Sequence, residues 1–379
     1  MRILFFSSYF LPYLSGLTVY PYRILKQLSK SNSVKVLTFP HKQNLKKVEQ
    51  MDSLLIVRVP YLFQVSKGYI SPQSLPVFFR EAERADIVIL TMPNVEGLFL
   101  AIVARMMGKP LILIYLCSPV FTGGLFASIV TLVLRASAIL QVSLATAIFA
   151  IPDYIQSQSV FNQLKKKLIP ALPPIEKKTI SQSTFASHLK QKGEKKWIGF
   201  VGRVSSEKGI EYLVEAISQL VNEANVELVF CGPSGPQVAG EKLYFQQIKT
   251  LLKQKKVPHR FLGMVDDEEI GAIYRSLDVL VLPSINQTEA FGMVQAEAML
   301  AGTPVVASNS PGVRLPIKLT QMGLLVPPKN STALADAIST VLKDKHRFAN
   351  SALIAKAHEI FNPEKTYKAY VDLLRKITT

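Results

Sequence analysis

The segment that most constrains this chain is residues 283–312, which read PSINQTEAFGMVQAEAMLAGTPVVASNSPG. The apolar run before it, LDVLVL at 277–282, predicts a short buried strand. Helix formers fill residues 291–301, and a Gly-Thr-Pro sequence then leads into a second apolar run at 304–308. The order strand, acidic turn, helix, strand predicts a βαβ unit of a parallel sheet.

Two glutamates of this segment are placed unusually. Glu289 lies in the predicted turn, and Glu297 follows 8 residues later inside an otherwise apolar helix. A carboxylate near a helix start is favoured by the helix dipole, so an exposed structural role is the alternative for Glu297. Gly292 leaves the N–H groups of the helix start uncovered, which favours an anion there. Because carboxylates accept hydrogen bonds from sugar hydroxyls, the pattern predicts a ligand with both sugar and phosphate.

The spacing Glu289-x7-Glu297 around Phe291-Gly292, followed by AGTPVVAS, resembles the donor signature of the family 4 retaining glycosyltransferases of GT-B fold. The resemblance implies that Glu289 contacts the transferred sugar and that Glu297 holds the ribose hydroxyls. It also implies that backbone amides bind the donor's diphosphate. These amides belong to Phe291, Gly292, Met293 and Val294.

A second motif follows the predicted strand 197–204, WIGFVGRV, where Gly202-Arg203 precedes Lys208-Gly209. Cations at the end of a parallel strand face the ligand crevice of an α/β sheet. The planar fork of Arg and the point charge of Lys suit a diphosphate, whereas exposed cations at a helix start would oppose the helix dipole. The resemblance assigns Arg203 and Lys208 to the donor diphosphate, so that they and Glu289 are the candidate catalytic residues.

Weaker donor contacts come from other turns of the same half. Gly232 follows the predicted strand 226–231 and matches the family's glycine-rich loop beside the nucleotide. Met264 and Val265 correspond to the strand end that lies against the nucleobase in the family. Gly16 matches one of the family's two loop glycines after the first strand.

The chain departs from the family pattern at three positions. Ser15 stands where the family usually has a second glycine, and Leu315 stands where it often has glutamate. Leu116 stands where related transferases commonly carry a histidine. Because leucine cannot carry a proton, the alternative function is a non-catalytic nucleotide-sugar-binding or scaffold protein of the same fold. An epimerase on this fold would need acid and base residues that the sequence does not identify.

The expected architecture is α/β, with two Rossmann-like domains facing across a cleft. A length of 379 residues allows two such domains. We expect an acceptor-side domain at 1–175, a polar linker at 176–196, and a nucleotide-sugar-binding domain at 197–362. A last helix, 363–379, is expected to cross back to the first domain.

Charge and hydropathy bear on the partners. Residues 1–175 contain 18 Lys and Arg against 7 Asp and Glu, so they carry most of the net charge of +17. This indicates an acidic partner, either anionic lipid or a phosphorylated substrate, unless it reflects a lysine-rich proteome. No nucleic-acid-binding motif is present, and we expect no nucleic-acid partner. Residues 121–150 contain one charge, Arg135, and as a helix they would be apolar nearly all round, which predicts deep burial or contact with a membrane surface.

The expected location is the cytoplasm, with the inner face of the membrane as a peripheral site. Cys117 and Cys231 lie far apart in separate apolar runs, which is typical of a reducing compartment. The start, MRILFFSSYF, predicts a first strand and not a signal peptide. We expect a glycosyltransferase that moves a sugar from a nucleotide-diphosphate sugar to a sugar or lipid-linked acceptor with retention, without a metal or a cofactor.

Overall fold

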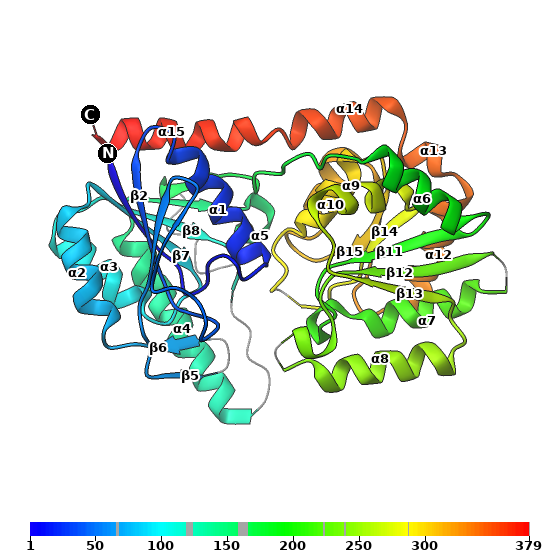
Figure 1. Cartoon of the computed structure of the whole chain (residues 1–379), viewed down its shortest axis with the longest axis horizontal. Coiled ribbons are helices and arrows are strands. Elements are labelled where there is room, and N and C mark those ends of the chain that lie inside the picture. Colours follow the sequence, from blue (N-terminus) through cyan, green and yellow to red (C-terminus); the bar gives the residue numbers. More distant parts are fainter. Residues whose placement is uncertain are drawn as a thin grey trace. The chain divides into compact units, whose positions relative to one another are not determined.

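The computed structural model describes residues 1–65, 68–118, 124–157, 166–222, 224–238, 240–286 and 288–378. The chain divides into two compact units (Figure 1). The first contains Met1–Pro174 together with Pro363–Thr379, and the second contains Ile175–Asn362.

The first unit is built on an eight-stranded sheet in the order β10-β9-β8-β7-β1-β2-β4-β3, within the described residues. Its strand pairs are parallel except for the antiparallel pair of β3 with β4. The strands are β1 (Arg2–Phe6), β2 (Ser33–Thr38), β3 (Val48–Met51), β4 (Leu54–Arg58), β7 (Ile87–Met92), β8 (Leu111–Tyr115), β9 (Ala147–Ala150) and β10 (Leu168–Pro170). A separate hairpin consists of β5 (Phe63–Val65) and β6 (Gly68–Ile70).

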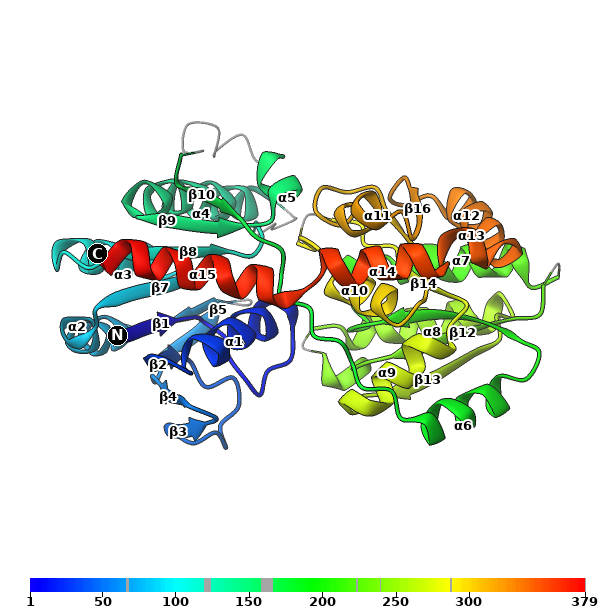
Figure 2. The same cartoon turned by 90° about the horizontal axis from the view of Figure 1, so that it is seen from above.

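Helices cover both faces of this sheet, which explains why β7 and β8 are apolar and buried throughout. The helices are α1 (Gly16–Leu28), α2 (Ser74–Arg84), α3 (Gly97–Met106), α4 (Gly124–Leu144), α5 (Pro152–Gln156) and α15 (Pro363–Thr378). Because parallel crossovers are right-handed, α1 lies on one face, and α2, α3 and α4 lie on the other. Helix α15 packs beside α1, and α3 packs between α2 and α4 (Figure 2).

The predicted long apolar helix at 121–150 is wrong in its second part. Helix α4 ends at Leu144, and β9 (Ala147–Ala150) follows as a buried strand that pairs with β8. Residues 121–123 lie outside the described residues. The apolar run continues through the boundary because a strand buried on both faces is as apolar as a buried helix. None of the helices in the described parts of the chain has the length and hydropathy needed to cross a bilayer.

The second unit contains a six-stranded parallel sheet in the order β13-β12-β11-β14-β15-β16, within the described residues. The strands are β11 (Lys196–Val201), β12 (Val226–Cys231), β13 (His259–Gly263), β14 (Val279–Leu282), β15 (Val305–Ser308) and β16 (Gly323–Val326). Its helices are α6 (Gln182–Lys192), α7 (Ile210–Leu220), α8 (Lys242–Gln254), α9 (Asp267–Ser276), α10 (Met293–Leu300), α11 (Leu315–Thr320), α12 (Ser331–Lys343), α13 (Lys345–Phe348) and α14 (Ser351–Ile360). Helices α7 and α8 lie on one side of the sheet and α9 and α10 on the other (Figure 1).

The segment expected to be a linker, 176–196, packs on the second unit. It contains α6, which lies against α9. His188 of α6 is buried, with its ring edge-on to Trp197 at 5.9 Å between centroids. The segment is polar in composition because most side chains of α6 are exposed to solvent.

The first unit has a mostly parallel sheet and the second a parallel one, both covered by helices, and the expected α/β class is confirmed. The cleft expected between the units stays a prediction.

Candidate functional site

The candidate site lies where the second sheet changes its winding direction. From β11 the chain passes to β12 and β13 on one side, and it returns to β14, β15 and β16 on the other. The loops that leave neighbouring β11 and β14 therefore diverge at the carboxyl edge of the sheet. In open α/β sheets, ligands bind at this switch point.

The two loops are joined by an ion pair between predicted site residues. Lys208, after β11, donates from Nζ to the Glu289 carboxylate, after β14. The side chains are 15% and 19% exposed, so solvent screens the pair only in part. The Ile285 N–H also donates to the Glu207 carbonyl oxygen at 3.1 Å. The structure thus brings together a cation and a carboxylate that are 81 residues apart in the chain.

Arg203 lies in the same loop as Lys208. Its Nη2 donates to Glu207 Oε1 at 2.9 Å, and its side chain is 28% exposed. The sequence interpretation did not single out Glu207, although its spacing of four residues from Arg203 is the signal of a local ion pair. Each of the two cations thus has a carboxylate neighbour, which offsets its charge.

Two glycines allow the loops to approach each other. Gly209 has φ +63°, and a Cβ there would lie 2.6 Å from the Pro283 carbonyl oxygen. Gly232 has φ +129°, and a Cβ there would lie 2.4 Å from the Gly202 carbonyl oxygen. Both positions therefore require the absent side chain of glycine as well as its backbone freedom.

Backbone hydrogen bonds extend the sheet past its strand ends at the predicted glycines. The Gly202 N–H donates to the Cys231 carbonyl oxygen at 2.8 Å, and the Gly232 N–H donates to that of Gly263 at 2.7 Å. The Cys231 thiol is buried, and burial raises its pKa to about 12. The backbone hydrogen bonds therefore join the ends of β11, β12 and β13 at this edge. Because its pKa is raised, the Cys231 thiol is not a nucleophile near neutral pH.

Helix α10 starts at the same edge. Gly292 is its N-cap with φ +73°, and Phe291 before it is buried. The side-chain amide of Gln295 donates to the carbonyl oxygens of Phe291 and Val313, each at 2.9 Å. This buried amide, which the sequence interpretation did not identify, ties the helix start to the loop after β15. Met293 and Val294, at the first two helical positions, are half-buried.

Glu297 has a different surrounding from Glu289. It lies further along α10, and its Oε2 accepts from the Tyr274 hydroxyl of α9 at 2.9 Å. Tyr274 is fully buried, so it fixes the carboxylate on the side of α10 that faces α9. Tyr274 was also missed by the sequence interpretation, because nothing in a helix pattern links it to a residue 23 positions away.

Met264 and Val265 follow β13 at the same edge. Met264 is 57% exposed and Val265 is half-buried. An exposed thioether at this edge of the sheet can lie against a flat apolar ring.

Gly16 lies in the first unit, and the structure does not place it with the residues above. It is the exposed first residue of α1, whose N-cap is Ser15. The Ser15 N–H donates to the Thr18 hydroxyl at 3.1 Å. Leu116 follows β8, is buried, and donates its N–H to the Met92 carbonyl oxygen at 3.0 Å.

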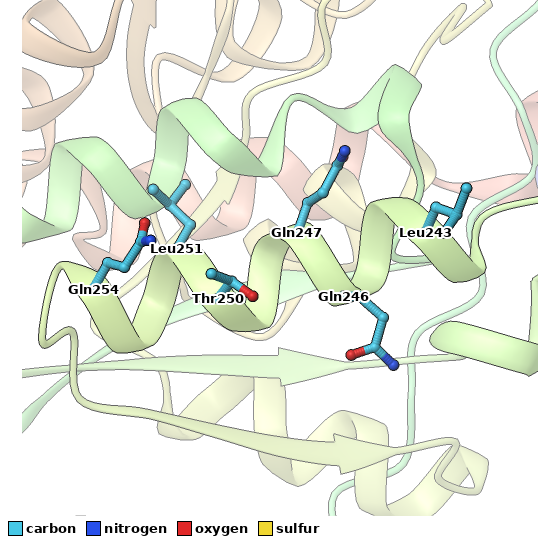
Figure 3. A pocket seen from close by; sticks show the side chains of 6 residues that line it. All are labelled: Leu243, Gln246, Gln247, Thr250, Leu251 and Gln254. Atoms are coloured by element: carbon cyan, nitrogen blue, oxygen red, sulfur yellow. The ribbon is translucent and has the colours of Figure 1, made fainter.

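A shallow hollow runs along α8 (Figure 3). It is lined by Leu243, Gln246, Gln247, Thr250, Leu251 and Gln254. No titratable group lines it, so it offers no acid, base or charge for chemistry. Among the described residues, no group of three or more His, Cys, Asp or Glu side chains could hold a metal ion.

Comparisons with known proteins find similarity within the second unit. Residues 181–358 match the family model described as "Glycosyl transferases group 1". An uncharacterised glycosyltransferase of Methanocaldococcus jannaschii is 38% identical over 153 residues, 40% of this chain and 37% of that protein. The D-inositol 3-phosphate glycosyltransferase of Corynebacterium glutamicum is 35% identical over 153 residues, 39% of this chain and 35% of that protein. The chain thus spans little more than a third of the length of these relatives.

Solved structures resemble the chain over its whole length. The sucrose-phosphate synthase of Thermosynechococcus elongatus has a TM-score of 0.79 at 20% identity, covering 100% of this chain and 99% of that one. The HepE protein of Anabaena, in complex with UDP-glucose, has a TM-score of 0.78 at 20% identity, covering 99% and 100%. These similarities confirm the predicted GT-B fold.

Proposed function

We propose that the chain transfers a sugar from a nucleotide-diphosphate sugar to an acceptor. The match of residues 181–358 to the model of the group 1 glycosyl transferases supports this proposal. The observation that carries the proposal is the Lys208–Glu289 pair across the switch point of the second sheet. The pair places a cation, which can bind a diphosphate, beside a carboxylate, which can accept hydrogen bonds from a sugar. A nucleotide-diphosphate sugar contains both of these groups.

The proposed donor position follows from the loops. The diphosphate takes Lys208 and Arg203 as counter-ions, and the N–H groups of residues 291–294 at the start of α10 add to them. When the phosphate takes Lys208, the Glu289 carboxylate is released to accept from the sugar's hydroxyls. Glu297, held by Tyr274, accepts from the ribose. Gly16, Gly202 and Gly232 are proposed to let the backbone approach the donor, and Met264 and Val265 to lie against its base.

The proposed chemistry is transfer with retention. The bond from the anomeric carbon to the diphosphate oxygen breaks as the acceptor oxygen bonds to the same face of that carbon. The acceptor's proton passes to an oxygen of the leaving diphosphate, so Leu116 need not supply a base. Lys208 and Arg203 stabilise the negative charge that develops on the leaving group, which is usually the largest catalytic contribution. The proposal needs no metal ion and no cofactor.

The first donors to test are uridine nucleotides. The HepE structure contains UDP-glucose, and the trehalose-6-phosphate synthase of E. coli has been solved with UDP-2-fluoro glucose. The proposed acceptor is a sugar or a lipid-linked acceptor, used at the inner face of a membrane by a peripheral protein of the cytoplasm. Cys117 and Cys231 are both buried and are not joined in a disulfide, which supports a reducing compartment.

The test is a thermal-shift screen of UDP-, GDP- and ADP-sugars followed by an assay of nucleoside diphosphate release. A ligand held at 100 times its dissociation constant stabilises the protein by about 2.7 kcal/mol, which is visible as a shift in Tm. We expect Lys208→Met and Arg203→Met each to lower kcat/KM by about 100-fold or more, about 2.7 kcal/mol. Lys255→Met is the matched control, because Lys255 is exposed and follows α8 at the opposite edge of the sheet.

The alternative is a nucleotide-sugar-binding protein without activity, and the buried apolar Leu116 is the observation that favours it. Donor binding with neither transfer nor hydrolysis, with any acceptor tried, would favour this alternative. Normal turnover in both the Lys208 and the Arg203 variants would contradict the site itself.

A further inference from the structure

Helix α4 exposes its apolar side. The exposed positions on α4 that are apolar follow the helical repeat of three and four residues: Ile129, Leu132, Val133, Ala136, Ile139 and Leu140. The large side chains among them are 41% to 68% exposed. A helix on the surface of a globular protein normally directs a polar stripe to the solvent.

The buried side of α4 carries polar as well as apolar side chains. Gln141 is 1% exposed, and its side-chain amide donates to the Ser137 hydroxyl at 3.1 Å. Thr131 on the same side is half-buried. Val142 on the inner side is 0% exposed, so α4 is apolar on its inner side as well as on its outer one. A helix that is apolar nearly all round indicates that its outer stripe also contacts something apolar.

The neighbouring helix α3 continues this surface. Phe99, Ile102 and Met106 are spaced by three and four residues and are 39% to 81% exposed. Helices α3 and α4 pack side by side on one face of the first sheet (Figures 1 and 2). We call these outward side chains of α3 and α4 the apolar face. Exposed patches of this kind mark contact with a membrane or another protein.

The charges beside the apolar face decide between these two partners. Arg105 of α3 and Arg135 of α4 are exposed, and neither helix contains an Asp or a Glu. A symmetric contact between two copies of this face would bring arginines against arginines, with no carboxylate from either helix to pair with them. An anionic lipid surface supplies both the apolar medium and the phosphates.

We propose that the apolar face docks the first unit on a bilayer that contains anionic lipids. Leu132, Val133 and Phe99 enter the boundary between headgroups and acyl chains, and Arg105 and Arg135 contact lipid phosphates. The inference rests on the proposed function in one respect, because a membrane-held acceptor is the reason for docking on a membrane. Lipid binding itself is measured without any sugar transfer. Failure of one therefore leaves the other intact.

The experiment is sedimentation of the full chain with two kinds of vesicle, phosphatidylcholine alone and phosphatidylcholine mixed with phosphatidylglycerol. We expect clear binding to the mixed vesicles and weaker binding to the neutral ones. The double variant Leu132→Glu/Val133→Glu should bind the mixed vesicles about 100-fold more weakly, since two apolar side chains no longer enter the lipid. Arg105→Gln and Arg135→Gln should each weaken binding about fivefold, and only on mixed vesicles.

The matched control is Leu243→Glu. Leu243 is an exposed leucine on α8 of the second unit, and its replacement should leave vesicle binding unchanged. Circular dichroism and the Tm of each variant verify folding, and donor binding to the second unit should be the same in all of them. Unaltered vesicle binding by the double Glu variant overturns the proposal. The proposal is also overturned if the wild-type protein binds neither kind of vesicle and instead forms a dimer. This dimer would be seen by sedimentation velocity and would be absent in the double Glu variant.

Discussion

Lys208 and Glu289 offset each other's charge across the loops of β11 and β14. A diphosphate that binds Lys208 must therefore compete with Glu289. We predict that Glu289→Gln binds free UDP about tenfold more tightly, about 1.4 kcal/mol, because Lys208 keeps its full charge for the phosphates. Transfer should nevertheless fall by about 100-fold or more, because the carboxylate for the sugar is lost. Isothermal titration and the release assay measure the two effects separately.

The opposite signs make this prediction specific. A variant that is merely misfolded loses both UDP binding and transfer. Glu194→Gln, at an exposed position before β11, serves as the control and should change neither. Weaker UDP binding by Glu289→Gln would show that Glu289 does not compete with the phosphate.

Gly209 holds the two loops at close distance, and we predict that Gly209→Ala is strongly destabilising. A Cβ at this position would meet the Pro283 carbonyl oxygen at 2.6 Å and Ile285 Cγ2 at 2.5 Å, at a φ of +63°. Strain and overpacking together should cost about 2–5 kcal/mol in the free energy of unfolding, measured by urea denaturation. Gly108→Ala, just after α3, is the control with a similar φ of +67° and no atom within 4 Å. It should cost only about 1 kcal/mol, and equal losses in both variants would contradict the role of close approach.

At the residue scale, the sequence was most informative about charged groups near glycines. Arg203, Lys208 and Glu289 stand out because charges follow predicted apolar strands, and parallel strands place their carboxyl ends at one edge. The partners Glu207, Tyr274 and Gln295 could not be predicted as a set. Their contacts depend on side-chain directions across loops and between helices, which no periodicity in the sequence specifies.

At the scale of elements, three strands of the second sheet share one buried polar network. Glu227 of β12 accepts from the Trp197 Nε1–H of β11 at 2.9 Å and from Arg260 Nη2 of β13 at 2.9 Å. The Arg260 guanidinium lies over the Trp197 ring at 4.8 Å. Burial raises the pKa of Glu227, but the hydrogen bonds and charge of Arg260 outweigh it and hold the pKa below its ordinary value of 4.5.

This network predicts a pH dependence of stability. Because the folded pKa of Glu227 is lowered, its carboxylate stabilises the fold above pH 4.5, and this contribution is lost as the pH falls through the lowered folded value. We predict that Glu227→Gln lowers the free energy of unfolding by about 2 kcal/mol at pH 7. The difference from the wild type should shrink below pH 4.5, as measured by urea denaturation at each pH. A difference that is constant with pH would show that the charge is irrelevant.

Strands buried on both faces were the most predictable elements. The sequence predicts strands at 111–115 and 226–231, which are the bounds of β8 and β12. Pro110 precedes the first run, and Asn225 and Gly232 flank the second, so these residues help to set the bounds. The short edge strands β3, β5 and β6 were not predicted. Only their backbone hydrogen bonds to a neighbouring strand distinguish them, and their sequences carry no long apolar run. Strand β9 was not predicted because its apolar residues continue the apolar run of α4, so no change in composition marks where the strand begins.

At the scale of the whole molecule, the two units differ in how far their sequence identifies them. The family model matches 181–358, inside the second unit, whereas the fold resembles solved GT-B structures over the full length. The proposed donor site consists of charges and glycines at fixed spacing, and such a pattern is recognisable in a sequence. The first unit keeps the fold through apolar strands, which many sequences satisfy. The apolar face of α3 and α4 belongs to this first unit, outside the matched segment, so it needed the structure to be recognised.

The chain returns from the second unit to complete the first. Helix α15 (Pro363–Thr378) stacks Tyr370 on Phe149 of β9 at 3.6 Å between ring centroids. The hydroxyls of Tyr370 and Tyr20 are hydrogen-bonded at 3.2 Å, and the Thr366 hydroxyl donates to the Leu172 carbonyl oxygen at 2.9 Å. Tyr370 is 1% exposed, so α15 is part of the core of the first unit.

We therefore predict that Tyr370→Ala destabilises the first unit alone. Loss of a buried aromatic side chain should lower its free energy of unfolding by about 3–5 kcal/mol. Hydrogen exchange read residue by residue should show lost protection in β1, β7 and β8, while β11, β12 and β14 keep theirs, because the second unit has its own core. Lys368→Ala, at an exposed position of the same helix, is the control and should change neither set. Equal loss of protection in both sets of strands would show that the two units unfold as one, and α15 would then stabilise the whole chain.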